Sequence, residues 1–179
     1  MKKCILILIS VFIILMMIFG NRKVRIAPVF GKFFSVLKNA KTNRFSFWDF
    51  VCFIVFPVGL SCIIVFGFDC VIDESLASVL TEVFATVFTV LFGFAAILAG
   101  KMESKNVIEK RVVNETFISI MMATLLALLS SVLSIVLIKT SNQVMIYVFS
   151  LLVYSSSLIM LMDILMISKR IFIIYSDNE

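Results

Sequence analysis

Two carboxylic acids lie within long apolar runs of this 179-residue chain, where an ionisable side chain is costly. Glu82 lies seven residues after Ser75, which is roughly 10 Å along a helix. Asp163 precedes Lys169 by six residues and lies at a similar depth from the opposite end of the predicted bundle. Intramembrane acids usually face a bundle interior or water, so both are candidate functional residues. They are too far apart for a proton relay, and simpler interpretations exist: Glu82 extends outward to water, and Asp163 pairs with Lys169 or Arg170 of a neighbouring helix.

The usual signatures of catalysis and metal binding do not occur in the sequence. There is no histidine, and the four cysteines (Cys4, Cys52, Cys62 and Cys70) have no CxxC or other zinc-like spacing. Three of them lie in apolar runs, where cysteine acts as a small hydrophobic residue. No Walker loop, GxSxG, HExxH, catalytic carboxylate pair or dinucleotide-binding fingerprint occurs either. We therefore expect a protein that is not an enzyme and that carries no cofactor and no metal.

The elements that carry these residues are long apolar helices. The chain is 62% hydrophobic and 15% charged, against roughly half and a quarter in soluble domains. Crossing a bilayer takes roughly 17–25 apolar residues, and five runs approach or reach that length: Cys4–Phe19, Asp49–Phe68, Leu76–Gly100, Phe117–Ile138 and Val144–Ile167. Backbone groups in lipid must pair within their own segment, which favours helices. The predicted fold is all-α, a multi-pass transmembrane helical bundle with four core helices in two hairpins and a short N-terminal apolar segment.

The chain divides into an N-terminal apolar segment (1–20), a basic stretch (21–47), the four-helix core (48–170) and a short tail (171–179). The first segment is similar to a signal peptide but lacks a clear cleavage site. A short membrane helix with its N-terminus outside fits the charges better, and an interfacial segment remains an alternative. In the basic stretch, Phe30 and Phe33 recur at helical spacing while Lys32 and Lys38 point elsewhere. This pattern fits a helix on the membrane surface or a solvated loop equally well.

Basic residues fall almost entirely on one side of the predicted bundle. With both ends of the four-helix core inside, thirteen lysines and arginines lie in the cytoplasm and only Lys139 lies outside, leaving Lys2 and Lys3 aside. The positive-inside rule therefore predicts a membrane protein with a cytoplasmic C-terminus, and it explains the net charge of +5. The segment 101–115 is expected to extend the flanking helices as a docking surface. The predicted contacts with lipid or a partner are Arg22, Lys23, Arg25, Lys32, Lys38, Lys101, Lys110 and Arg111.

Small residues gather on one face of the third and fourth of the five apolar runs. In the earlier run this face, which includes one carboxylate, consists of Ser78, Glu82, Ala85, Thr89, Gly93, Ala96 and Gly100. In the later run it consists of Ser119, Ala123, Ala127, Ser130 and Ser134. Small side chains let helices approach closely, so a packing seam within or between chains is the favoured interpretation. The alternative is a water-filled path lined by this face in an oligomer, and in either case we expect Glu82 to face the oligomer axis.

The last four runs also resemble a known family. Trp48-Asp49 leading into a helix with Pro57, the run SVLTEVFATVFTVLFGFAAILAG and the ending LLVYSSSLIMLMDILMISKRIFIIY resemble the KwaA family, over about Phe45 to Tyr175. KwaA is the membrane component of the bacterial Kiwa anti-phage system. The resemblance implies a homo-oligomeric inner-membrane sensor, for example a tetramer, that detects phage-induced membrane disturbance and holds a cytoplasmic DNA-binding effector of the KwaB type. The chain itself would contact membrane lipids and no nucleic acid. A pore-forming, holin-like effector and a small ion channel are the alternatives on the residues alone.

Overall fold

The predicted all-α architecture is confirmed in a computed structural model that describes residues 27–36, 47–101 and 107–176, in which no strand occurs. The N-terminal apolar segment and most of the basic stretch lie outside the described residues. The helices are α2 (Ala27–Val36), α3 (Phe47–Phe50), α4 (Phe56–Cys62), α5 (Glu74–Lys101), α6 (Val107–Ile138) and α7 (Gln143–Ser176). Two π-helical segments, Val51–Val55 and Ile63–Gly67, join α3 to α4 and extend α4.

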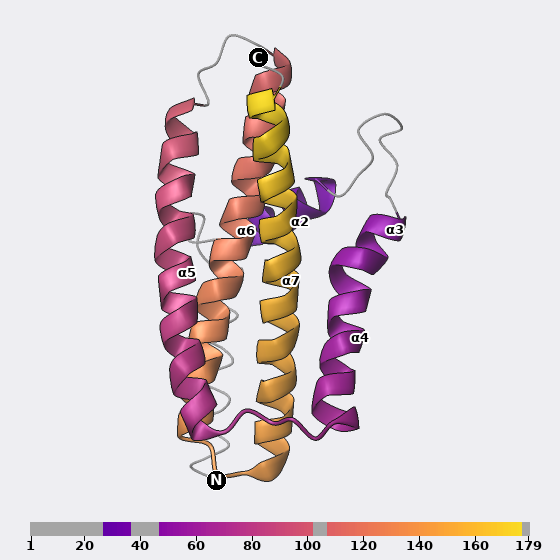
Figure 1. Ribbon diagram of the computed structural model, residues 1–179, viewed down its shortest axis with the longest axis vertical. Coiled ribbons are helices and arrows are strands. Elements are labelled where there is room, and N and C mark those ends of the chain that lie inside the picture. The colour runs from indigo at the N-terminus through magenta and orange to yellow at the C-terminus, as the bar shows by residue number, and fades with distance from the viewer. Residues whose placement is uncertain (1–26, 37–46, 102–106, 177–179) are drawn as a thin grey trace.

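Four stretches of these helices are long and apolar enough to cross a membrane. They are Phe47–Gly67, Glu74–Gly100, Val112–Ile138 and Gln143–Phe172, with mean hydropathies from 2.1 to 2.6. Each is longer than the roughly 17 residues that a crossing requires. Figure 1 shows them running along the long axis of the molecule. The structure is thus compatible with a multi-pass membrane protein.

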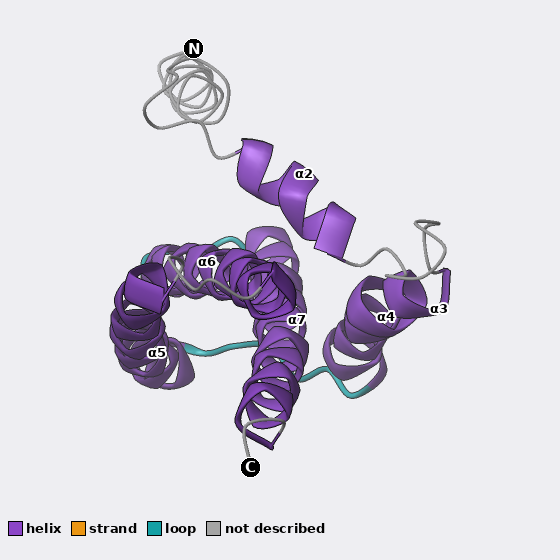
Figure 2. Ribbon diagram, turned by 90° about the horizontal axis from the view of Figure 1, so that it is seen from above, coloured by secondary structure: helices purple, strands orange, loops and turns teal. Residues whose placement is uncertain are grey.

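Helix α6 is the centre of the bundle. Half of the residues in its most apolar window are buried, against 17% to 22% in the other three spans. Helix α5 packs against α6, α6 against α7, and α7 against α4. These four helices therefore follow one another in an open, curved row (Figure 2). The end of the bundle where α5 and α7 finish and α6 begins is called the Arg170 end below, and the opposite end is called the Asp73 end.

Helix α6 begins ten residues earlier than the apolar run that predicted it. The run was expected to start at Phe117, whereas the helix starts at Val107. Six of the ten additional residues are polar or charged, so the apolar run did not include this segment, although its near-helical spacing predicted a helical extension. This extension brings Glu115 into the helix and next to α7.

Pro57 lies on the face of α4 that packs into the bundle. Pro57, Ser61 and Val65 recur every four residues, and all three are buried. The Ser61 hydroxyl donates a hydrogen bond to the Pro57 carbonyl at 2.8 Å. Proline cannot donate a backbone hydrogen bond to the preceding turn. The helix around Pro57 changes its hydrogen-bond pattern, with a π-helical segment on each side of α4.

Helix α2 lies crosswise to the long helices and packs against α6 (Figure 2). Its main anchor is Phe33, which is 1% exposed, whereas Phe30 and Phe34 are 39% and 38% exposed. Part of the basic stretch is therefore a helix with an aromatic anchor on the bundle.

Candidate functional site

The small-residue stripe of α6 is an interface within the chain. Its five members, Ser119, Ala123, Ala127, Ser130 and Ser134, are all 0% exposed. Side chains this small let a neighbouring helix approach closely, which maximises van der Waals contact between helices in a membrane. Of the two interpretations predicted for this stripe, a packing seam is the one that matches its buried position within the chain.

A pair of hydroxyl groups links α6 to α7 in the middle of this seam. The Oγ atoms of Ser130 and Ser156 are 2.7 Å apart, and both residues are buried. The Ser156 hydroxyl also lies 2.7 Å from the carbonyl oxygen of Leu152, one turn earlier in α7. Interhelical hydrogen bonds of this kind contribute modestly, on average about 0.6 kcal/mol.

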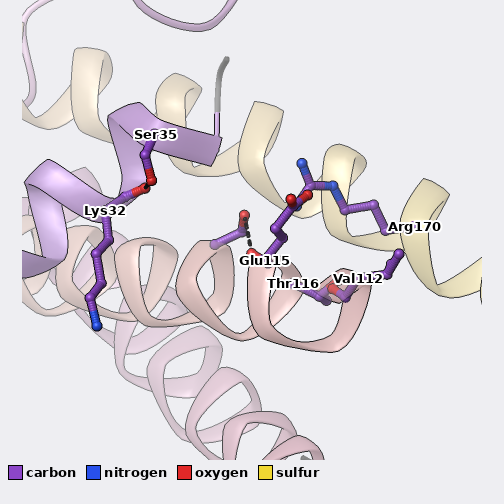
Figure 3. Close-up of polar contacts among 7 residues, drawn as sticks. Lys32, Ser35, Val112, Glu115, Thr116 and Arg170 are labelled. Atoms are coloured by element: carbon purple, nitrogen blue, oxygen red, sulfur yellow. Dashed lines mark hydrogen bonds and ion pairs between the residues drawn. The ribbon is translucent and has the colours of Figure 1, made fainter. Parts of the chain in front are cut away.

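A second polar contact joins the same two helices near the Arg170 end. The guanidinium of Arg170 lies 3.7 Å from a carboxylate oxygen of Glu115, and the two side chains are 19% and 29% exposed (Figure 3). Thr116 and Ser119 follow Glu115 on α6. Their hydroxyls donate to backbone carbonyls four residues earlier, at Val112 and Glu115. Those hydroxyls are thereby satisfied within α6, and the charged contact with α7 is made by Glu115.

Asp163 lies between these two contacts on the same face of α7. It follows Ser156 by seven residues and precedes Arg170 by seven, which is two helical turns in each direction. Because both flanking residues contact α6, Asp163 also faces α6. The residue is 0% exposed, and neither of its carboxylate oxygens has a hydrogen-bond partner among the described residues.

The surroundings of Asp163 set what its carboxylate can do. The nearest compensating charge is Arg170, which interacts with it electrostatically but already pairs with Glu115. Within the described part of the chain Asp163 forms no direct ion pair with Lys169 or Arg170, and Lys169 is exposed; pairing with these residues of a neighbouring helix stays a prediction. A buried acidic side chain without a hydrogen-bond partner is costly, so Asp163 weakens the α6–α7 seam between the serine pair and the Arg170 end.

The small-residue face of α5 points away from the rest of the chain. All seven of its predicted members are exposed: Ser78, Glu82, Ala85, Thr89, Gly93, Ala96 and Gly100. The face that packs on α6 is a different one, formed by larger residues such as Phe84 and Leu91. The hydroxyl of Thr89 is satisfied within α5, since it donates to the carbonyl of Ala85 at 2.9 Å. The α5 face is therefore available to a surface outside this chain.

The two predicted acids are far apart in the fold. Glu82 lies in the part of α5 close to the Asp73 end, whereas Asp163 lies in the half of α7 close to the Arg170 end. Glu82 is exposed and Asp163 is buried. No group of three or more histidine, cysteine or acidic side chains is placed to hold a metal ion within the described ranges.

The predicted basic contacts are described only in part. Lys32 lies on α2 and Lys110 on α6, and both are exposed. Lys101 is the last residue of α5, and Arg111 lies in the first turns of α6. The remaining four, Arg22, Lys23, Arg25 and Lys38, lie outside the described residues.

At the Asp73 end, the segment between α4 and α5 is fixed to α7. The Ile72 backbone N–H donates to the Ser150 hydroxyl at 3.0 Å, and the Tyr147 hydroxyl donates to Asp69 at 2.5 Å. The ring of Phe66 stacks on Tyr147 with centroids 6.2 Å apart. Asp69 has a φ of 52°, a left-handed conformation that aspartate tolerates better than most residues.

Helix α5 begins with an aspartate cap at the same end. Asp73 accepts a hydrogen bond from the Leu76 backbone N–H at 2.8 Å and another from the Ser75 hydroxyl at 3.0 Å. These two bonds, the backbone bond first, favour the ionised carboxylate and hold the pKa of Asp73 below its ordinary value.

Comparison of the chain with protein families, with curated proteins and with solved structures finds no match.

The residues that sequence reasoning had not selected are Glu115, Asn114, Tyr147 and Asp69. For Glu115 a signal existed: a charged residue at near-helical spacing immediately before an apolar run. For the contact between Tyr147 and Asp69 none did, because it joins residues 78 positions apart.

Proposed function

We propose that this protein is a non-enzymatic membrane scaffold that forms a homo-oligomer through the small-residue face of α5 and presents its Arg170 end to a cytoplasmic partner. The observation that carries the proposal is the contrast between two similar stripes. The stripe of α6 is buried within the chain, whereas every member of the α5 stripe is exposed. A face built for close helix contact, but unused within the chain, fits contact with a second copy.

Glu82 supports the same proposal. It is exposed on an apolar span, with Ala85 one turn away on the same face. Acids at such positions usually face a bundle interior or water, because contact with lipid is costly. Assembly through this face moves Glu82 out of lipid and toward the oligomer axis.

The orientation follows from the charges. The Arg170 end lies in the cytoplasm, because Lys101, Lys110 and Lys169 gather there and, among the described residues, Lys139 is the only base at the other end. The membrane is the bacterial inner membrane. In the setting that the sequence resemblance implies, the scaffold is a sensor of anti-phage defence whose cytoplasmic partner acts on DNA.

Cysteine cross-linking tests the assembly. In a chain whose four cysteines are replaced by serine, Ala85→Cys and Thr89→Cys are expected to give inter-subunit disulfides in membranes. Val83→Cys and Val90→Cys, which are exposed elsewhere on α5, serve as matched controls and are expected to give much less product. Equal yields from both pairs, or no product at Ala85 and Thr89, would contradict the proposal. Recovery of a cytoplasmic protein with the scaffold from its native operon tests the partner.

A channel is the second candidate, because the same exposed face carries a carboxylate. In that case the α5 faces of several copies surround water rather than pack against one another. Ion flux into liposomes that contain the purified protein separates the two functions. A flux that Glu82→Gln reduces favours the channel, and sealed liposomes favour the scaffold.

A further inference from the structure

Helix α2 and helix α6 enclose a pocket that none of the contacts above occupies. Its volume is about 310 Å³. Two residues of α2 and four of α6 line it: Val29, Lys32, Asn114, Phe117, Ile118 and Met121. Neither the α6–α7 seam nor the face of α5 contributes to this lining.

The α6 wall of the pocket is a strip along one side of the helix. Asn114, Phe117, Ile118 and Met121 follow the i, i+3, i+4, i+7 pattern of one helix face and span seven steps, roughly 10 Å along the axis. Asn114 is the third residue of the apolar span and Met121 the tenth. The pocket therefore starts at the surface level of the span and continues toward its apolar middle.

The lining is polar at one side and apolar at the other. Its two polar side chains, Lys32 and Asn114, are both exposed, whereas the apolar residues of the α6 wall are partly buried. This polarity fits an amphiphile with a polar head at the surface and an apolar chain directed inward.

The charge of the pocket selects the head of that amphiphile. Lys32 is a cation, and among the described residues no carboxylate contributes to the lining. The nearest acid in the sequence of α6, Glu115, is already paired with Arg170 of α7. In Figure 3 the Lys32 side chain extends from α2 on the side away from that pair. An anionic head thus meets a positive charge that forms no ion pair with the described residues.

We propose that the α2–α6 pocket binds an anionic phospholipid of the cytoplasmic leaflet. Its phosphate contacts Lys32 and Asn114, and one acyl chain lies along Phe117, Ile118 and Met121. The proposal rests on the membrane orientation given under the proposed function but not on assembly through α5. Phe33 anchors α2 beside the pocket, and the lipid fills the space under α2. The position of this helix is thereby coupled to the lipid composition of the membrane.

Lipid binding by the purified full chain tests the proposal. The protein in a neutral detergent is titrated with phosphatidylglycerol or phosphatidylcholine of identical acyl chains, and bound lipid is counted by native mass spectrometry. Phosphatidylglycerol is expected to bind about fivefold more tightly, the effect of one lysine at an anionic surface. Lys32→Gln is expected to remove this preference and Lys32→Arg to keep it.

Lys110→Gln is the matched control, because Lys110 is an exposed lysine near the same end of α6 that does not line the pocket. It is expected to leave the preference unchanged, and an equal loss in both glutamine variants would mean general attraction to the surface and overturn the site. Ile118→Trp fills the pocket and is expected to abolish tight binding while far-UV circular dichroism stays unchanged. Displacement by glycerol 3-phosphate as effective as that by the whole lipid would assign the site to a free anion. The lipid count is independent of Ala85 cross-linking, so either proposal can fail alone.

Discussion

Placing the same bulky side chain on the two small-residue stripes should have opposite effects on the isolated chain. Ala127 is 0% exposed in the α6 stripe, and leucine there adds three carbon atoms at a site without free space. Overpacking of this kind costs about 1–3 kcal/mol. Ala85 is exposed on α5, and leucine there should change the free energy of unfolding by no more than about 0.5 kcal/mol.

The assay is unfolding of the monomer in mixed micelles with a rising fraction of sodium dodecyl sulfate, followed by helical circular dichroism. Ala127→Leu should lower the midpoint clearly, and Ala85→Leu should leave it within error. In membranes the second variant should instead lose the inter-subunit cross-link at Thr89→Cys. If Ala85→Leu destabilises the monomer as much as Ala127→Leu, the α5 face is buried within the chain and the packing order derived above is wrong.

Three further predictions concern single polar contacts. A double-mutant cycle of Ser130→Ala and Ser156→Ala in the same unfolding assay should give a coupling of about 0.6 kcal/mol, and a coupling of zero would mean that the two hydroxyls do not bond. Asp163→Leu should raise the free energy of unfolding by about 1–3 kcal/mol, because it replaces a buried polar side chain without a hydrogen-bond partner by an apolar one of similar size; a decrease would reveal a donor that the structure lacks. Since the pKa of Asp73 is lowered below 3.8 by the folded state, its contribution is complete above that pH and is lost as the pH falls through the folded value. The unfolding midpoint of Asp73→Asn should therefore vary less in this acid range than that of the wild type.

Hydropathy predicted the helices because backbone pairing in lipid leaves few alternatives. The apolar run that begins at Leu76 corresponds to α5, which starts at Glu74, and the run that begins at Val144 corresponds to α7, which starts at Gln143. The exceptions are the start of α6, which includes charged residues such as Glu115 before the apolar run, and the end of α7, which continues nine residues beyond Ile167 to Ser176.

The direction in which each face points could not be predicted in the same way. The stripes around Ala85 and Ala127 have nearly the same composition, yet one is exposed and the other buried. Lipid tails are as apolar as leucine, so hydropathy does not distinguish a lipid-facing side from a packed side. The position of Asp163 was accessible, because its seven-residue spacing from Ser156 and Arg170 places the three on one face. That this face meets α6 depends on tertiary packing.

The contact of α4 with α7 has a consequence for the order in which the protein is assembled during synthesis. The span Phe47–Gly67, which contains α4, is made well before α7, the helix that packs against α4. Helix α7 begins at Gln143, 76 residues after Gly67. At roughly 5–20 residues per second, the ribosome needs about 4–15 s to make that length of chain. Until then the buried face around Pro57 and Ser61 lacks α7, and Ser150 and Tyr147 are not yet present to fix the segment before α5. Chains that stop before α7 would thus leave α4 without its partner, and such nascent chains are the natural substrates for membrane quality control.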